Sequence, residues 1–394
     1  MQTKVHLSVV AALASVIAGP AFALTSTELS TDQQILSQYN LVNFGDLNTS
    51  NETEGPIAVG GNFIATGNHN AGFNNGGADP VVNGTTYGEV TVYGNVTGGF
   101  NPSVTGASAS TPLAYVQGNI SGQFSLNNPG TLNVEGTAVG ATIGGTNTAS
   151  VNTSQSVFTG VSSVPVHTGL STSSVFPFGS FTSNFQTPLT DLANALAVLP
   201  TTAGVTAQAL GSQTNLTAGA DYTYGGKTYG VITTTLANLA ADTNLVGINN
   251  GSNAATIVIV TGNSSTALTA LNGNDDESKV IWDFVNATSL NFGGSWYGTI
   301  LAPLANFTAN SDLTGTVVAN SLTQNAELHW TSNAPSGASN YGFRGDLSGL
   351  SALTSSPAAT QVPEPASLAL LGTGLIGAAL LRRGLKRRSA QPGQ

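Results

Sequence analysis

The stretch that decides the fold runs from Trp296 to Trp330, WYGTILAPLANFTANSDLTGTVVANSLTQNAELHW, and contains one short motif twice. GTILA from Gly298 recurs as GTVVA from Gly315, at an offset of 17 residues (315 − 298). FTANSDL from Phe307 recurs as LTQNAEL from Leu322, at an offset of 15 (322 − 307). This period is too short for a strand-helix-strand unit, whereas two short strands with Gly and Asn corners fit it. Stacked copies would place each strand about 4.8 Å from its equivalent, so the stretch predicts two turns of a β-solenoid with Gly298 and Gly315 at equivalent corners.

The same order of strand, Gly, polar residue and apolar residue occurs earlier in the chain and predicts further turns. It appears as VGGNF from Val59, VYGNV from Val92, VQGNI from Val116 and VEGTA from Val134. The spacing of these motifs is irregular because loops vary in length while strands do not. An antiparallel meander of hairpins uses the same turn residues and stays open as the alternative.

One helix is expected between the two groups of strands. Residues 146–180 are rich in Ser, Thr and Val without a sustained period, which indicates a connector. After it, Thr187 is expected as the N-cap, Pro188 as the first helical residue and Pro200 as the stop. The apolar residues fall on one side of this helix, which should therefore lie on the side of the solenoid. They are Phe185, Leu189, Leu192, Leu196 and Leu199.

Residues 1–23 are typical of a signal peptide. Lys4 precedes an apolar run that is too short to span a bilayer, and a helix-breaking Gly-Pro pair follows. The segment ends in Ala21-Phe22-Ala23, the A-x-A pattern at which signal peptidase cleaves. We therefore expect an exported protein.

The C-terminal end carries a second apolar segment. After a domain predicted at 24–349 and a linker at 350–361, residues 366–381 predict a transmembrane helix. Positive charge directly after it would place that end in the cytoplasm and the domain outside. The basic residues are Arg382, Arg383, Lys386, Arg387 and Arg388, ahead of a tail at 389–394.

Composition narrows the function classes. The chain of 394 residues is 40% hydrophobic but only 7% aromatic and 7% charged, with 48 Gly and no Cys. This suits stacked strands with Gly and Asn corners, and it excludes disulfides and thiolate chemistry. Between the two end segments, three basic residues stand against every acidic residue except Glu364 (3 − 18 = −15). Such a charge repels nucleic acid, so nucleic acid is not expected as a partner.

Few residues are candidates for chemistry. The motif GTGLIG at 372–377 matches a dinucleotide fingerprint but lies inside the apolar segment, so we interpret it as a chance match. The acidic loop Asn274-Asp275-Asp276-Glu277 could collect calcium, although a solvated turn is the simpler interpretation and no cofactor is otherwise expected. Catalytic and metal sites are predicted to be absent.

The main alternative is a carbohydrate-active β-helix enzyme, a polysaccharide hydrolase, which needs paired carboxylates. The acidic residues that could serve are Asp283, Asp312 and Glu327. Since Asp312 and Glu327 are equivalent positions of the repeat, a role at the corners is favoured for both.

The tail resembles the PEP-CTERM sorting signal. The residues that carry the resemblance are Val362, Pro363, Glu364 and Pro365, followed by the apolar segment and the basic cluster. The resemblance implies recognition by an exosortase of a Gram-negative bacterium that makes exopolysaccharide. It also implies transient anchoring in the inner membrane and export to the cell surface or extracellular matrix.

The domain resembles the choice-of-anchor A family of surface domains. The resemblance rests on Tyr39 to Leu47, on Glu54-Gly55 with Val59 to Asn62, and on Gly298 to Pro303 with Glu327-Leu328-His329. The rung GTILA with a flanking helix is also similar to ice-binding β-solenoids, although long Thr ladders are absent. No catalytic residues come with either resemblance.

These observations together predict a right-handed parallel β-helix with one flanking α-helix and a C-terminal transmembrane helix. We expect a structural or adhesive protein without enzymatic activity whose ligand is exopolysaccharide or another cell-surface component. A carbohydrate-active enzyme is the alternative, and an ice-binding protein is the third option.

Overall fold

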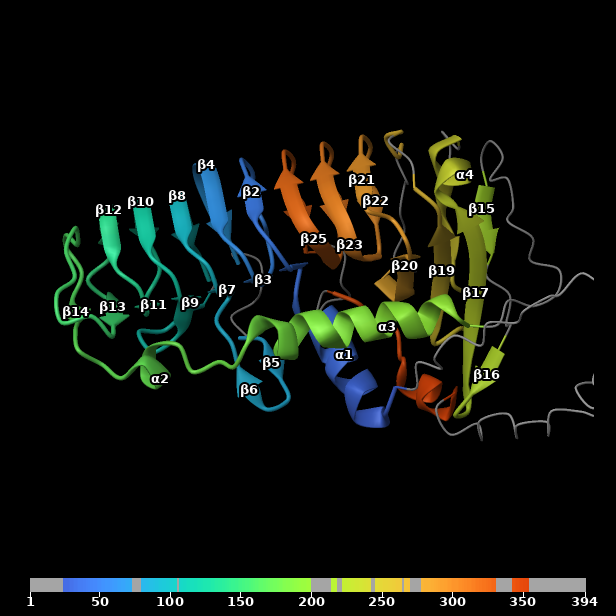
Figure 1. Ribbon diagram of the computed structural model, residues 1–394, viewed down its shortest axis with the longest axis horizontal. Coiled ribbons are helices and arrows are strands. Elements are labelled where there is room, and N and C mark those ends of the chain that lie inside the picture. Colours follow the sequence, from blue (N-terminus) through green and yellow to red (C-terminus); the bar gives the residue numbers. More distant parts are fainter. Residues whose placement is uncertain are drawn as a thin grey trace, which may run out of the picture. The chain divides into compact units, whose positions relative to one another are not determined.

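The computed structural model describes residues 24–72, 79–104, 106–199, 214–217, 222–241, 245–263, 266–269, 278–330 and 342–353. In them the chain is mostly β, with parallel strands and few helices, an arrangement compatible with the expected β-solenoid (Figure 1). The signal peptide, the loop 274–277 and all segments expected beyond residue 353 lie outside the described residues. Within the described part, no helix has the length and apolar character needed to cross a membrane.

The strands form three parallel ladders, which we call the first, second and third faces. The first face consists, in spatial order, of β17 (Lys227–Thr235), β19 (Ala255–Thr261), β20 (Val280–Phe284), the beginnings of β23 (Thr299–Ala309) and β25 (Val317–Gln324), β1 (Leu41–Asn43), β3 (Ile57–Val59), β7 (Val90–Val92), β9 (Pro112–Val116), β11 (Gly130–Val134), β13 (Ala149–Thr153) and β14 (Val166–His167).

The second face consists of β21 (Ser289–Phe292), the ends of β23 and β25, β2 (Leu47–Thr49), β4 (Phe63–Ala71), β8 (Val96–Pro102), β10 (Ile120–Leu126) and β12 (Ala138–Gly145). The third face is shorter and consists of β22 (Trp296–Tyr297), β24 (Leu313–Thr314) and β26 (Leu328–His329). Outside the three faces, β15 (Thr214–Thr217) pairs with β18 (Leu245–Asn249), β5 (Val81–Val82) with β6 (Thr85–Thr86), and β16 (Tyr222–Tyr224) with β17.

The spatial order of the strands differs from their order in the chain. The last strand of the repeat, β25, pairs in parallel with β1 and β2, the first strands of the domain. Figure 1 shows the consequence: β2 lies beside β25, and the chain builds outward from there to β14 before it returns to β17 at the other side. We call the junction of β25 with β1 and β2 the seam. The stacking of successive turns does not predict this closure.

The repeat that opened the sequence analysis is confirmed with both of its offsets. Ile300, Leu301 and Ala302 pair with Val317, Val318 and Ala319, while Phe307 pairs with Leu322. Gly298 and Gly315 both have positive φ, of 101° and 115°, and a Cβ on Gly315 would lie 2.6 Å from the carbonyl oxygen of Gly298. The two glycines therefore hold equivalent corners. The antiparallel meander was the wrong alternative, because the ladders of the three faces are parallel.

The earlier Gly-polar motifs are stacked corners as well. Gly61, Gly94, Gly118 and Gly136 follow one another so closely that a Cβ on each of the last three would come within 2.4 Å of the carbonyl oxygen of the glycine before it. The residue after each glycine extends this ladder through hydrogen bonds. Asn95 N–H donates to Asn62 Oδ1 over 3.0 Å, and Asn119 N–H donates to Asn95 Oδ1 over 2.8 Å.

The predicted helix is confirmed as α3 (Thr187–Ala197), with its apolar side buried. Thr187 is not its N-cap, because a π-helical turn, η1 (Thr182–Gln186), runs directly into it and places Pro188 inside the first turn. Figure 1 shows α3 lying along the first face beside β19, β20 and β23. Because α3 spans several strands, it covers their outward-facing apolar side chains.

The expectation of one flanking helix was wrong. A second long helix, α1 (Ser26–Gln38), precedes β1 and begins with a capping box in which Thr25 and Glu28 bond to each other's backbone N–H. Its low content of apolar residues explains why periodicity did not predict it. Short helical segments include α2 (Thr172–Val175), α4 (Leu236–Ala241) and the 3₁₀ helix η3 (Ser348–Leu353).

The expected connector at 146–180 also needs correction, because its first residues form β13 and pair with β11. Later in this segment, Phe176 packs against Tyr93 and Phe178 against Tyr115, and Phe181, directly after the segment, also packs against Tyr93. The connector therefore covers the part of the first face that α3 does not reach.

Candidate functional surface

The second face carries a row of polar side chains that point away from the core. Inward residues such as Leu322, Leu47 and Phe63 are buried, and side chains alternate along a strand, so their neighbours point outward. Strand pairing places these neighbours in one row, each at least partly exposed. In spatial order the row is Asn291, Thr308, Thr323, Asn48, Ile64, Thr97 and Ser121.

We call these seven residues the outward row. None of them is charged, and all but Ile64 present a hydroxyl or an amide. Parallel strands lie about 4.8 Å apart, so the row offers one short polar group at each such step. Neighbouring groups are close enough to interact, since Ser121 Oγ lies 3.4 Å from Thr97 Oγ1. The outcome is a regular neutral surface in a strongly acidic domain.

Amide ladders lie beside the outward row, and one of them ends on its first residue, Asn291. Asn325 Nδ2 donates to Asn310 Oδ1 over 2.8 Å, and Asn310 Nδ2 donates to Asn291 Oδ1 over 2.9 Å. Beyond the seam, Asn101 Nδ2 donates to Asn70 Oδ1 over 2.6 Å. These bonds fix the orientation of each amide while leaving a second N–H and a second lone pair for solvent or a ligand.

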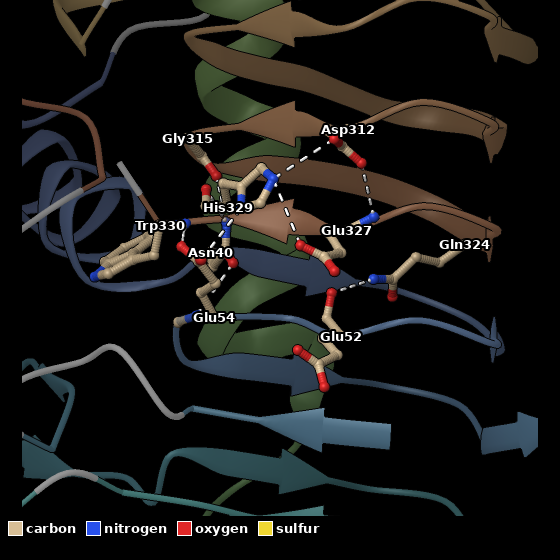
Figure 2. Close-up of polar contacts among 10 residues, drawn as sticks. Asn40, Glu52, Glu54, Asp312, Gly315, Gln324, Glu327, His329 and Trp330 are labelled. Carbon is tan, nitrogen blue, oxygen red and sulfur yellow. Dashed lines mark hydrogen bonds and ion pairs between the residues drawn. The ribbon is translucent and has the colours of Figure 1, made fainter. Parts of the chain in front are cut away.

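At the seam, one histidine gathers three carboxylates. Figure 2 shows the ring of His329 between Glu54, Asp312 and Glu327. His329 Nδ1 lies 3.1 Å from Glu54 Oε1, and His329 Nε2 lies 3.7 Å from both Asp312 Oδ2 and Glu327 Oε2. The other oxygen of Glu54 accepts from Trp330 N–H over 2.7 Å. Glu54 belongs to the first turn of the domain, whereas Asp312 belongs to the last turn but one and Glu327, His329 and Trp330 to the last, so this cluster joins the two ends of the domain.

The charge of this cluster depends on pH. The hydrogen bond to Glu54 raises the pKa of His329, and the Coulomb attraction of Glu54, Asp312 and Glu327 adds to it against partial burial. Asn40 supports the same junction, because its Nδ2 donates to Gly315 O and to His329 O. The cluster is thus a structural closure in which each charged group already has a partner. Among the residues that the structure describes, no group of three or more His, Asp and Glu side chains is arranged to hold a metal ion.

The structure does not bring the three candidate carboxylates together. Asp312 and Glu327 occupy equivalent corners next to His329, and Asp312 Oδ1 accepts from Glu327 N–H over 3.2 Å. Asp283 instead lies on β20, fully buried, between Ile259 and Leu301 in the outward-facing row of the first face. Burial raises the pKa of Asp283 well above its usual range, which favours the protonated form of the side chain. The corner role inferred for Asp312 and Glu327 is confirmed.

Sequence reasoning missed the part that Glu54, His329 and Asn40 play at the seam. All three belong to the motifs that carried the resemblance to surface domains, but about 275 residues separate the two ends. No spacing rule places the first turn beside the last one. The sorting motif, the signal cleavage site and the basic cluster lie outside the described residues, so these predictions remain untested by the structure.

Comparison with known proteins gives two matches. Residues 361–384 match the PEP-CTERM protein-sorting motif, which implies processing by an exosortase and export to the cell surface in Gram-negative bacteria. Residues 32–330 match the family described as "Putative Ice-binding-like adhesive domain". No curated protein and no solved structure matches the chain. Since the matched segment covers most of the chain and contains all three faces, the chain belongs to the ice-binding-like adhesive domain family.

Proposed function

We propose that this chain is an adhesive or structural protein of the cell surface or extracellular matrix that binds neutral polysaccharide through its second face. The domain is a right-handed β-solenoid of the choice-of-anchor A type. Signal peptidase removes residues 1–23, and the helix 366–381 holds the protein in the inner membrane until an exosortase processes the sorting signal. The released domain then joins the exopolysaccharide outside the cell.

The observation that carries this proposal is the outward row. Adhesion to a long polymer requires many weak contacts at a fixed spacing, and the row supplies hydroxyl and amide groups in that form. A neutral row in a domain of charge −15 favours an uncharged polymer over an anionic one, because the surrounding carboxylates repel anions.

The arrangement of the acidic residues favours adhesion over hydrolysis. A glycosidase needs two carboxyl groups on either side of one bond, with at least one free to transfer a proton. Here Asp283 is buried, while Asp312 and Glu327 both face His329. Ice binding is less well supported, because Asn48 and Ile64 interrupt the threonines of the outward row.

The test is sedimentation of the purified exported protein with insoluble exopolysaccharide. Thr97→Ala, Thr308→Ala and Thr323→Ala should each reduce the bound fraction slightly, and the triple variant should reduce it by about tenfold. Thr187→Ala, at an exposed side chain of α3, serves as the matched control and should bind like the unchanged protein. Sugar release that one substitution at Asp312 or Glu327 abolishes would instead support the hydrolase.

A further inference from the structure

The two ends of the stack of turns differ. At one end, β17 pairs with β19 on one side and with β16 on the other, so its outer edge is paired. At the opposite end, β14 pairs with β13 on one side, and in the described part of the chain no strand pairs with its other side. Figure 1 shows β14 as the outermost labelled strand there. We call the turn at residues 158–167 the open end, since the terminal turns of repeat proteins normally carry a cap.

The backbone at β14 presents hydrogen-bonding groups to the open end. Val151 pairs with Val166, and Val151 N–H donates to Pro165 O over 2.9 Å. Successive residues of a strand direct their N–H and C=O groups to opposite sides, so Val166 directs both of its groups away from β13. Pro165 lacks an N–H only on the side that faces β13. The proline therefore does not protect the outer edge of this strand.

The second face ends in the same way. Ile143 N–H donates to Gly160 O, and Ser162 N–H donates to Ile143 O, both over 2.8 Å. Val161 lies between these two residues and forms the bridge with Ile143. By the same alternation, Val161 directs its N–H and C=O away from the stack. The open end thus has one such residue on each of the two long faces.

The side chains of the open end are apolar and only partly covered. Phe158, Val161, Val164 and Val166 pack against the core, yet each stays partly exposed. One turn further in, the side chain of Val151 is fully buried. The apolar interior of the solenoid therefore reaches the surface at this end.

The open end is also free of charge. Residues 136–190 contain no Asp, Glu, Lys or Arg, in a domain whose net charge is −15. Edge strands are usually protected from association by charged side chains, and this one has none. Two acidic copies repel each other least where their neutral ends meet. A solenoid end also matches the cross-section and apolar interior of an identical end, which favours a second copy over another partner.

We propose that two copies of this chain associate end to end through their open ends. A two-fold axis beside Val166 makes the two β14 strands antiparallel, and the two Val166 residues then exchange both of their N–H···O=C hydrogen bonds. The partly exposed apolar side chains of the two copies become buried against each other. The dimer is thereby a continuous stack in which each copy caps the other.

Sedimentation equilibrium of the purified exported protein tests the proposal. The mass should rise with concentration from that of one chain towards that of two. Val166→Lys should weaken the association by at least about tenfold, because two like charges would face each other across the axis. The long lysine side chain can reach solvent through the open end, so the monomer should stay folded. Val198→Lys, at an exposed valine after α3, is the matched control and should associate like the unchanged protein.

A cross-link tests the same contact without a change of charge. The chain has no cysteine, so Val166→Cys introduces a single thiol. Paired residues of this kind have Cα atoms about 5.5 Å apart, within disulfide range, and mild oxidation should give a covalent dimer. Ser121→Cys, in the outward row, should remain monomeric under the same oxidation. A constant monomer mass at every concentration, an unchanged association in Val166→Lys, or equal cross-linking of both cysteine variants would overturn the proposal.

Discussion

The outward-facing row of the first face changes from apolar to polar two strands beyond the seam, between β3 and β7. On the side of the C-terminal strands it is mostly apolar, and on the side of the N-terminal strands it becomes polar after Ala58. In spatial order the row contains Ile259, Asp283, Leu301, Val318, Val42, Ala58, Thr91, Tyr115, Asn133 and Asn152. Both halves use the same ladder of backbone hydrogen bonds, so the difference arises from what covers them.

The cover explains the difference. The apolar half packs against α3, whose buried leucines need apolar partners. Beyond the N-terminal end of α3, the connector covers the strands with only a few phenylalanine rings. Hydrogen bonds between side chains of neighbouring strands stabilise this half of the row. Asn152 Nδ2, for example, donates to Asn133 Oδ1 over 3.0 Å. A solenoid strand can therefore be apolar on both sides or on one side only, and the neighbouring element decides which.

The largest change in the free energy of unfolding is expected from Gly315→Val. The new Cβ would lie 2.6 Å from the carbonyl oxygen of Gly298, at a residue with φ of 115°. Strain and steric clash together should lower the free energy of unfolding by more than about 3 kcal/mol. Gly140→Val is the matched control, because Gly140 has φ of 66° but an added Cβ would meet no atom within 4 Å. Equal losses for both variants in urea unfolding would show that the stacked corner adds nothing.

Asp283 is the exception in the apolar half, and removing it should stabilise the protein. Neither carboxyl oxygen of Asp283 has a hydrogen-bond partner within the described residues. Asp283→Leu should therefore raise the free energy of unfolding at pH 7 by about 1–3 kcal/mol, since an unsatisfied buried polar group is lost. Asp46→Leu, at an exposed corner, serves as the comparison and should not stabilise, because Asp46 accepts from Asn62 N–H over 2.7 Å.

The stabilisation should also depend on pH. The folded protein keeps Asp283 protonated well above the ordinary carboxyl pKa of 3.8, whereas the unfolded chain releases that proton near 3.8. As the pH rises above that value, the unfolded state binds fewer protons, so the unchanged protein loses stability. The advantage of Asp283→Leu should thus grow as the pH rises above 3.8. Burial raises the pKa of Asp32 to about 8, so Asp32 also makes the stability fall as the pH rises. The variant and the unchanged protein must therefore be compared at each pH.

Much of the fold could be predicted from local patterns, but the closure could not. The repeat around Gly298 and Gly315 determined its own register because strands of one period must pair with their equivalents. The leucines of α3 likewise predicted a buried side. The seam depends on contacts such as Asn40 with Gly315, which are 275 residues apart and leave no periodic trace. Among the candidate carboxylates, the sequence predicted the positions of Asp312 and Glu327, because the repeat makes them equivalent corners. It did not predict the position of Asp283.

The smallest loss of stability is expected from a substitution in the exposed corner ladder of the N-terminal half. Asn119 Oδ1 accepts from Thr137 N–H and from Thr137 Oγ1, both over 2.9 Å, and this corner has no cover. Solvent can replace these bonds, so Asn119→Ala should cost about 0.5–1 kcal/mol. Asn119→Asp keeps the accepting oxygen and should cost less, because a carboxylate also accepts from Thr137 N–H. If Asn119→Ala destabilises as much as Gly315→Val, the side-chain ladder and not the cover stabilises this half of the molecule, and the comparison between the two halves must be reversed.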